Sequence, residues 1–126
     1  MFDTVLVAGL GLMGGSMAKT IKARTLSRVL GWNRTRATAE QALADGSIDA
    51  IATDALFREV DLVIIGLYPQ ATVDWLLENM PKMKKGCVIV DMVGVKQFMV
   101  DHLEQAALDA GVNYVGGHPM AGREFS

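Results

Sequence analysis

Short apolar runs alternate with longer segments of helical spacing along the whole chain. The runs are rich in valine, isoleucine and leucine and fall at residues 4–8, 29–32, 62–67, 88–90 and 112–115, with a weaker one at 48–52. Segments in which apolar residues recur at helical intervals separate them, at residues 13–24, 35–45, 70–80 and 95–110. Apolar strands set between helices are typical of a parallel sheet that is covered on both faces. The pattern therefore predicts an α/β domain with a doubly wound parallel sheet.

The first apolar run leads directly into the string GLGLMGGS at residues 9–16, which holds a G-x-G-x-x-G pattern between a predicted strand and a predicted helix. In such a unit Gly9 suits the tight turn, Gly11 the approach of a pyrophosphate, and Gly14 the close packing of the helix. The free N–H groups of the helix then face the anion. We predict a Rossmann dinucleotide-binding fold; the alternative is that the glycines serve only a tight turn. The residues expected to hold the cofactor here are Gly9, Gly11, Leu12, Met13, Gly14 and Ser16.

A second cofactor signal follows the second predicted strand. NAD-binding domains usually place an acidic residue about 20 positions beyond the glycines, where it holds the ribose 2′-hydroxyl. Here Asn33 stands 19 positions after Gly14, and Arg34 and Thr35 follow it. An amide and a guanidinium suit a 2′-phosphate better than a carboxylate does, so we expect NADP in preference to NAD. The alternative is that Arg34 is an ordinary solvated charge and that Thr35 only caps the next helix.

Composition limits the remaining possibilities. With 126 residues, 51% of them hydrophobic, the chain fits one domain, residues 1–126. A net charge of −2 argues against nucleic acid as a partner, no apolar run is long enough for a membrane span, and we expect no metal site. The lone Cys87 is expected to be a small core residue, and it fits a reducing, cytoplasmic location. Because no further helix follows the last loop, we expect the chain to be a fragment of a longer protein.

Two further loops follow predicted strands and should lie at the carboxyl edge of the sheet. In the string GGHPMAGRE at residues 116–124, glycines and Pro119 hold His118 at the tip of a rigid loop. An imidazole can accept a proton near pH 7, so His118 is the candidate catalytic base. The other loop runs from Asp91 to Lys96. Asp91 could cap the next helix, and Lys96 could either steer an anionic ligand or simply be solvated.

Together these loops resemble those of the prephenate and arogenate dehydrogenases. The matching strings are GLGLMGGS, D-x-x-G-V-K at 91–96 and GGHPMAGRE, and the segment 61–69 resembles that family's fourth strand and following turn. The resemblance covers the whole chain but only the nucleotide-binding half of the family. It adds to the expected cofactor site three residues of that turn: Leu67, Tyr68 and Pro69.

The resemblance implies an oxidative decarboxylation that yields 4-hydroxyphenylpyruvate from prephenate or tyrosine from arogenate. His118 would accept the substrate's hydroxyl proton, and Gly117 and Pro119 would shape the substrate loop. Lys96 is the second candidate catalytic residue. Many members have a serine that hydrogen-bonds the catalytic histidine where this chain has Gly94. Another side chain or a water must then orient His118, or activity is lower. The family's C-terminal helical domain, absent from this chain, would form a homodimer and bind the substrate carboxylates.

Two other functions stay open at this stage. Enzymes of the 3-hydroxyacid dehydrogenase and pyrroline-carboxylate reductase types also open with a G-L-G-x-M-G string and use Asn-Arg-Thr after the second strand. They generally lack a histidine loop at this place, so His118 counts against them. The third possibility is a non-catalytic module that binds NADP, which the missing second domain supports.

Overall fold

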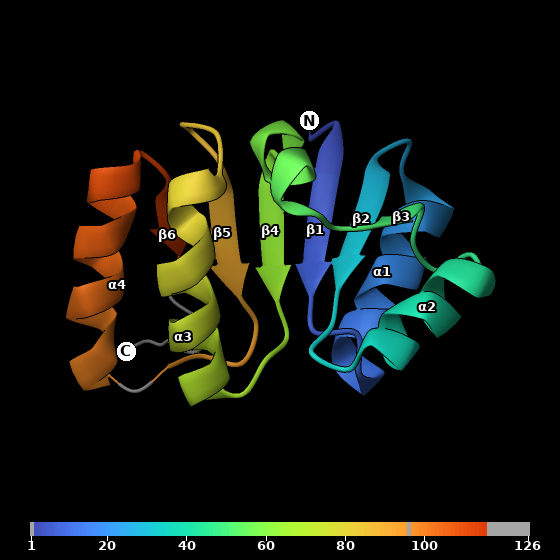
Figure 1. Ribbon diagram of the computed structural model, residues 1–126, viewed down its shortest axis with the longest axis horizontal. Helices are drawn as coiled ribbons and strands as arrows, with labels where there is room; N and C mark the ends of the chain where they lie inside the picture. Colours follow the sequence, from blue (N-terminus) through green and yellow to red (C-terminus); the bar gives the residue numbers. More distant parts are fainter. Residues whose placement is uncertain (1, 96, 116–126) are drawn as a thin grey trace.

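The computed structural model describes residues 2–95 and 97–115 and contains one sheet of six parallel strands (Figure 1). The strands lie in the order β3-β2-β1-β4-β5-β6, so the order reverses between β1 and β4. The strands are β1 (Thr4–Ala8), β2 (Arg28–Trp32), β3 (Ala50–Ile51), β4 (Leu62–Ile65), β5 (Val88–Asp91) and β6 (Asn113–Val115). The sequence prediction of a doubly wound α/β sheet is confirmed. An open sheet of this kind binds ligands at the carboxyl end of the reversal point.

Helices cover both faces of the sheet. They are α1 (Leu12–Arg24), α2 (Arg36–Ala44), α3 (Pro69–Asn79) and α4 (Gln97–Ala110), with two short 3₁₀ helices, η1 (Asp54–Glu59) and η2 (Met80–Lys82). The core is divided accordingly into two clusters. Leu6 and Ala8 of β1 pack with residues of α3 and α4, whereas Val5 and Val7 pack with residues of α1 and α2. Every residue of β1 is buried, which explains its uninterrupted apolar sequence.

The predicted and observed elements differ mainly at their ends. The third strand was expected over 48–52, but only Ala50–Ile51 pairs with β2. The reason lies in the preceding turn, where the N–H groups of Ser47 and Ile48 both donate to the carbonyl of Ala42 at the end of α2. Neither 3₁₀ helix was predicted, because single helical turns carry too short a pattern to be recognised.

Two other expectations concerned the core and the membrane. Cys87 is fully buried immediately before β5, and burial raises the pKa of its thiol to about 11. Its expected role as a small core residue is confirmed. None of the helices in the described part of the chain is long and apolar enough to cross a membrane.

The loops that concern the site lie at one edge. The strand arrowheads lie along the lower edge of the sheet in Figure 1, where the chain passes from β1 to α1, from β2 to α2, from β4 to α3 and from β5 to α4. The loops that carry the predicted cofactor residues, although far apart in the sequence, therefore come together at this carboxyl edge.

Candidate cofactor site at the carboxyl edge of the sheet

The glycine loop between β1 and α1 is packed so closely that two of its glycines have no room for a side chain. A Cβ on Gly14 would lie 1.7 Å from the carbonyl oxygen of Gly9. Gly9 itself has a φ of +94°, and a Cβ there would lie 2.7 Å from the carbonyl oxygen of Gly66, just after β4. Both residues therefore serve the close approach of α1 and β4 to the end of β1.

Gly11 has a different environment, since a Cβ placed on it would meet no atom within 4 Å. It occupies the N-cap position of α1, and its carbonyl accepts the first helical hydrogen bond from Gly15 at 2.7 Å. Having no side chain, Gly11 cannot cap the N–H groups of the first turn, and that turn contains no acidic residue. The start of α1 thus offers backbone N–H groups and a positive dipole end beside open space, which suits an anionic group.

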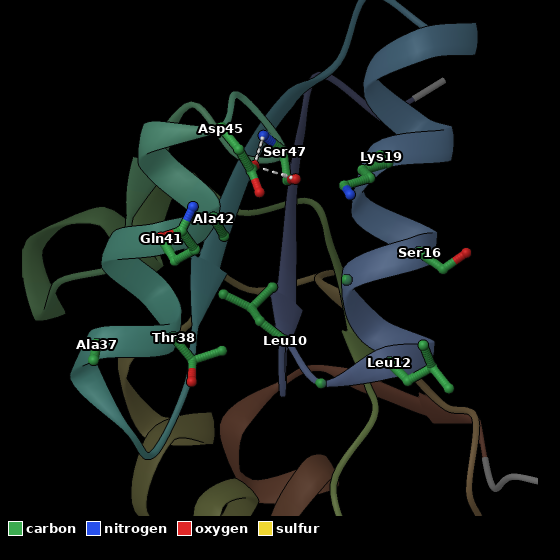
Figure 2. A pocket seen from close by; sticks show the side chains of 12 residues that line it. Leu10, Leu12, Ser16, Lys19, Ala37, Thr38, Gln41, Ala42, Asp45 and Ser47 are labelled. Atoms are coloured by element: carbon green, nitrogen blue, oxygen red, sulfur yellow. Dashed lines mark hydrogen bonds between the residues drawn. The ribbon is translucent and has the colours of Figure 1, made fainter.

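The first turns of α1 also expose apolar side chains. Leu12 is 96% exposed and Met13 is 53% exposed, although both lie beside the glycine loop. Figure 2 shows Ser16 in the second turn, with its side chain pointing away from α2. These three predicted cofactor residues belong to the first two turns of α1.

The loop after β2 is tied to the glycine loop by Asn33. Its Oδ1 accepts a hydrogen bond from the N–H of Leu10 at 2.8 Å, and its Nδ2 donates to the carbonyl of Thr35 at 3.1 Å. Thr35 occupies the N-cap position of α2, as predicted, but its side chain makes no capping hydrogen bond. The expectation that its hydroxyl caps the helix is therefore wrong in this structure, because the N–H of Thr38 in the first turn donates to the backbone carbonyl of Thr35 instead, at 3.1 Å.

The two arginines of this loop differ in their surroundings. Arg36 forms an ion pair with Glu40 one turn along α2, with its Nε 3.4 Å from the carboxylate. Arg34 is exposed and has no ion-pair partner within residues 2–95 and 97–115. Of the two guanidinium groups, Arg34 is thus the better placed to receive a phosphate.

The loop after β4 brings three more predicted residues to the same edge. Tyr68 is the N-cap residue of α3 and is 85% exposed, and Pro69 opens the helix. The hydroxyl of Thr72 donates to the carbonyl of Leu67 at 3.1 Å, which fixes the turn from strand to helix. An exposed aromatic ring at this edge of the sheet is suited to contact with a planar ligand.

The loop after β5 is organised by Asp91, which is 2% exposed. Its Oδ1 accepts hydrogen bonds from the N–H groups of Val93 and Gly94, at 3.0 and 2.9 Å. Both lie before α4 begins, so Asp91 closes a turn, and the alternative that it caps this helix is wrong. Gly94 has a φ of +88°, a conformation that L residues with side chains rarely adopt. The hydroxyl of Tyr114 lies 3.5 Å from Asp91 Oδ2, and burial together with this carboxylate raises the pKa of the phenol.

A groove of about 540 Å³ runs from the glycine loop between α1 and α2 (Figure 2). Lys19 of α1 projects into it from one side, and Thr38 and Gln41 of α2 line the other. At its far end the carboxylate of Asp45 accepts hydrogen bonds from Ser47, which hold its pKa below the usual value. Nothing in the local sequence pattern indicated this groove, because it depends on the separation of two helices that are adjacent only in the fold.

Several predicted residues fall outside the described part of the chain. These are the candidate catalytic residues Lys96 and His118 and the two substrate-loop residues Gly117 and Pro119. Within residues 2–95 and 97–115, no group of three or more histidine, cysteine, aspartate or glutamate side chains is arranged to hold a metal ion. Within the described residues, the candidate site consists of backbone groups and a few polar side chains.

Comparisons with known proteins agree with this arrangement. The family model "Prephenate dehydrogenase, nucleotide-binding domain" matches residues 17–126. The chain is 37% identical over 130 residues to a prephenate dehydrogenase of Bacillus subtilis, a match that covers all of this chain and 35% of the relative. A prephenate dehydrogenase of Lactococcus lactis is 28% identical over 127 residues, with 97% of this chain and again 35% of the relative covered. The chain thus spans about a third of the length of these curated relatives.

Solved structures give the same picture. Prephenate dehydrogenase from Aquifex aeolicus, in complex with hydroxyphenyl propionate and NAD⁺, superposes with a TM-score of 0.81 at 26% identity, covering 99% of this chain and 44% of that one. A Synechocystis arogenate dehydrogenase gives a TM-score of 0.74 at 22% identity, covering 82% of this chain and 37% of that one. A 3-hydroxyisobutyrate dehydrogenase of Mycobacterium tuberculosis gives 0.75 at 20% identity, covering 90% and 39%. The last two likenesses are evidence of the fold alone.

Proposed function

Because the chain belongs to the family of prephenate dehydrogenase nucleotide-binding domains, we propose that it is the cofactor-binding domain of an enzyme that oxidatively decarboxylates prephenate or arogenate with NAD(P)⁺. The observation that carries this proposal is the uncapped start of α1 beside Gly11, at the point where the strand order reverses. A dinucleotide pyrophosphate fits such a place, because it needs N–H donors, a positive dipole and close backbone approach.

The chemistry divides between the cofactor and the protein. When bound, the nicotinamide accepts the hydride that leaves the ring carbon bearing the substrate hydroxyl, and loss of the ring carboxylate as CO₂ makes the ring aromatic. His118 is proposed to accept the hydroxyl proton as the hydride leaves, a task suited to a neutral imidazole. Gly117 and Pro119 are proposed to shape the loop around it, and Lys96 to steer the anionic substrate.

We further propose that NADP⁺ is preferred to NAD⁺. The residue after β2 is Asn33 and not an acid, so no carboxylate at this position repels a 2′-phosphate. Arg34 supports the preference, because it is exposed at this loop and is not paired with any described carboxylate, whereas Arg36 is engaged with Glu40. NAD⁺ is the cofactor of the Aquifex relative, so use of both cofactors is compatible with the family.

The whole enzyme is proposed to be a cytoplasmic homodimer. The support is the family resemblance, in which a helical C-terminal domain forms the dimer and contacts the substrate carboxylates, together with a single, buried cysteine. Choice between prephenate and arogenate then belongs largely to that second domain.

The decisive experiment is an assay of NADPH formation with prephenate and with arogenate by the longest natural form of the protein, as wild type and as His118→Asn. We expect the substitution to lower turnover by about 10²- to 10⁴-fold, the usual contribution of a general base, while NADPH binding persists. A matched control is His102→Asn in α4, which should retain turnover. Normal turnover by His118→Asn would contradict the proposed base, and a wild type that binds NADPH but converts neither substrate would favour a non-catalytic module.

A further inference from the structure

The side chain of Asn33 joins two loops that are distant in the sequence. Its carboxamide oxygen accepts the N–H of Leu10 at 2.8 Å, 23 residues earlier in the chain, and its nitrogen donates to the carbonyl of Thr35 at 3.1 Å. Leu10 lies within the glycine loop, directly before Gly11, and Thr35 is the N-cap residue of α2. One planar group thus fixes the loop expected to bind pyrophosphate and the loop expected to bind the adenosine ribose.

These two partners determine which residue type fits here. The N–H of Leu10 can only donate, and the carbonyl of Thr35 can only accept, so the side chain must offer one acceptor and one donor. Asparagine meets both requirements, whereas aspartate would keep the first bond and set a carboxylate oxygen against the carbonyl of Thr35. The presence of an amide is therefore explained by the backbone around it, without reference to any ligand.

A backbone bond lies beside this connection. The N–H of Gly9 donates to the carbonyl of Trp32 at 2.8 Å, which continues the pairing of β1 and β2 past the last strand residue. Asn33 extends the same connection by one more residue on each side, from Gly9 to Leu10 and from Trp32 to Asn33. The next residue of the chain is Gly11, where an added Cβ would have open space around it. The bond to Asn33 thus holds the residue immediately before Gly11.

We infer that Asn33 is a positioning residue that couples the pyrophosphate loop to the ribose loop, and that discrimination between NADP⁺ and NAD⁺ is left to Arg34. The inference rests on the proposed cofactor binding and deepens it. It gives Asn33 a different role from the one expected from sequence, which was direct donation to a 2′-phosphate. Only one hydrogen of Nδ2 is needed for the bond to Thr35, and the other is available to donate to a phosphate. Measurement must therefore separate the positioning role from direct phosphate contact.

The test measures the affinities of NAD⁺ and NADP⁺ for the longest natural form of the protein, by calorimetry, in four forms: wild type, Asn33→Ala, Asn33→Asp and Arg34→Ala. We expect Asn33→Ala to weaken both cofactors by the same factor, about 5- to 20-fold for the loss of two hydrogen bonds. The ratio of the two affinities should stay as in the wild type. Arg34→Ala is the matched comparison, and it should change the ratio by weakening NADP⁺ more than NAD⁺.

Asn33→Asp separates positioning from a general loss of stability. The aspartate keeps the acceptor for Leu10, so NAD⁺ affinity should recover in part relative to Asn33→Ala, whereas NADP⁺ affinity should not, because a carboxylate repels the 2′-phosphate. All forms are compared well below their unfolding temperatures, so that each affinity refers to folded protein.

Three results would overturn the inference. A loss confined to NADP⁺ in Asn33→Ala would make Asn33 a direct phosphate contact, and unchanged affinity for both cofactors would remove its coupling role. A wild type that binds neither cofactor would refute the proposed cofactor site itself, a failure visible before any variant is measured.

Discussion

At the scale of single residues, the three glycines of the first motif have three separate explanations. Gly14 and Gly9 are required by neighbouring backbone, because a Cβ would lie 1.7 Å from Gly9 oxygen in one case and 2.7 Å from Gly66 oxygen in the other. Gly11 has no such neighbour, and its φ of −69° is open to any residue. Its lack of a side chain is therefore explained by the proposed ligand and not by the fold.

This difference predicts opposite outcomes for two alanine substitutions. Gly14→Ala should destabilise the fold by about 1–3 kcal/mol or more, since α1 must move away from Gly9. Gly11→Ala should change the free energy of unfolding by less than about 1 kcal/mol and yet lower NADP⁺ affinity at least about tenfold, because its Cβ occupies the approach of the pyrophosphate. Urea denaturation and calorimetric titration measure the two effects. Normal NADP⁺ binding by Gly11→Ala would contradict the proposed position of the pyrophosphate.

At the scale of elements, the opposite edge of the sheet is held by a carboxylate. Asp61, directly before β4, accepts hydrogen bonds from the N–H groups of Asp3 and Thr4 at the start of β1, at 3.0 and 2.9 Å. It also forms an ion pair with Lys84. The Lys84 ammonium and the N–H of Thr4 hold the pKa of Asp61 below its usual value. The start of the β1–β4 pairing therefore depends on an ionised side chain.

The pH dependence of this contribution follows from the direction of the shift. Since the folded-state pKa lies below the unfolded value of 3.8, the stabilisation is present above that pH and is lost as pH falls through the folded-state pKa. Asp61→Asn should lower the free energy of unfolding by about 1 kcal/mol at pH 7 and less at pH 2. Asp101→Asn, on the exposed side of α4, is the control and should have little effect at either pH. An equal loss for Asp61→Asn at both pH values would contradict the assigned role of the carboxylate.

The elements themselves were largely predictable, and the main differences lie at the ends of strands. β1 was predicted to the residue, because a strand buried on both faces leaves a continuous apolar run in the sequence. The end of β4 was placed two residues late. Gly66 and Leu67 continue the apolar run, but after the bond from the N–H of Gly66 to the carbonyl of Ala8 the chain turns into α3. A run of apolar residues indicates burial, and it does not by itself say where sheet pairing stops.

At the scale of the whole molecule, the parallel sheet gathers the ends of β1, β2, β4 and β5 at one edge, where the proposed cofactor would contact several loops at once. Binding to the folded state alone must then stabilise the domain. NADP⁺ at about 100 times its dissociation constant should raise the free energy of unfolding by about 2.7 kcal/mol and the unfolding midpoint by roughly 10 °C. Thermal unfolding followed by circular dichroism measures the shift, and Gly11→Ala should reduce it. No shift with saturating NADP⁺ or NAD⁺ would contradict a cofactor site.

The sequence by itself determined the alternation of strands and helices, the parallel sheet, the positions of the loops proposed to bind the cofactor, and the resemblance to the family that the comparisons confirm. These features follow from local periodicity and short motifs, which can be recognised directly in the amino-acid sequence. Only the tertiary structure decided that Asn33 bonds to Leu10, that Asp91 closes a turn instead of capping α4, and that a groove separates α1 from α2. Each of these depends on atoms that the packing of separate elements brings together. Hydrogen-bond partners set by packing produce no periodic pattern in the sequence, so they cannot be predicted from it.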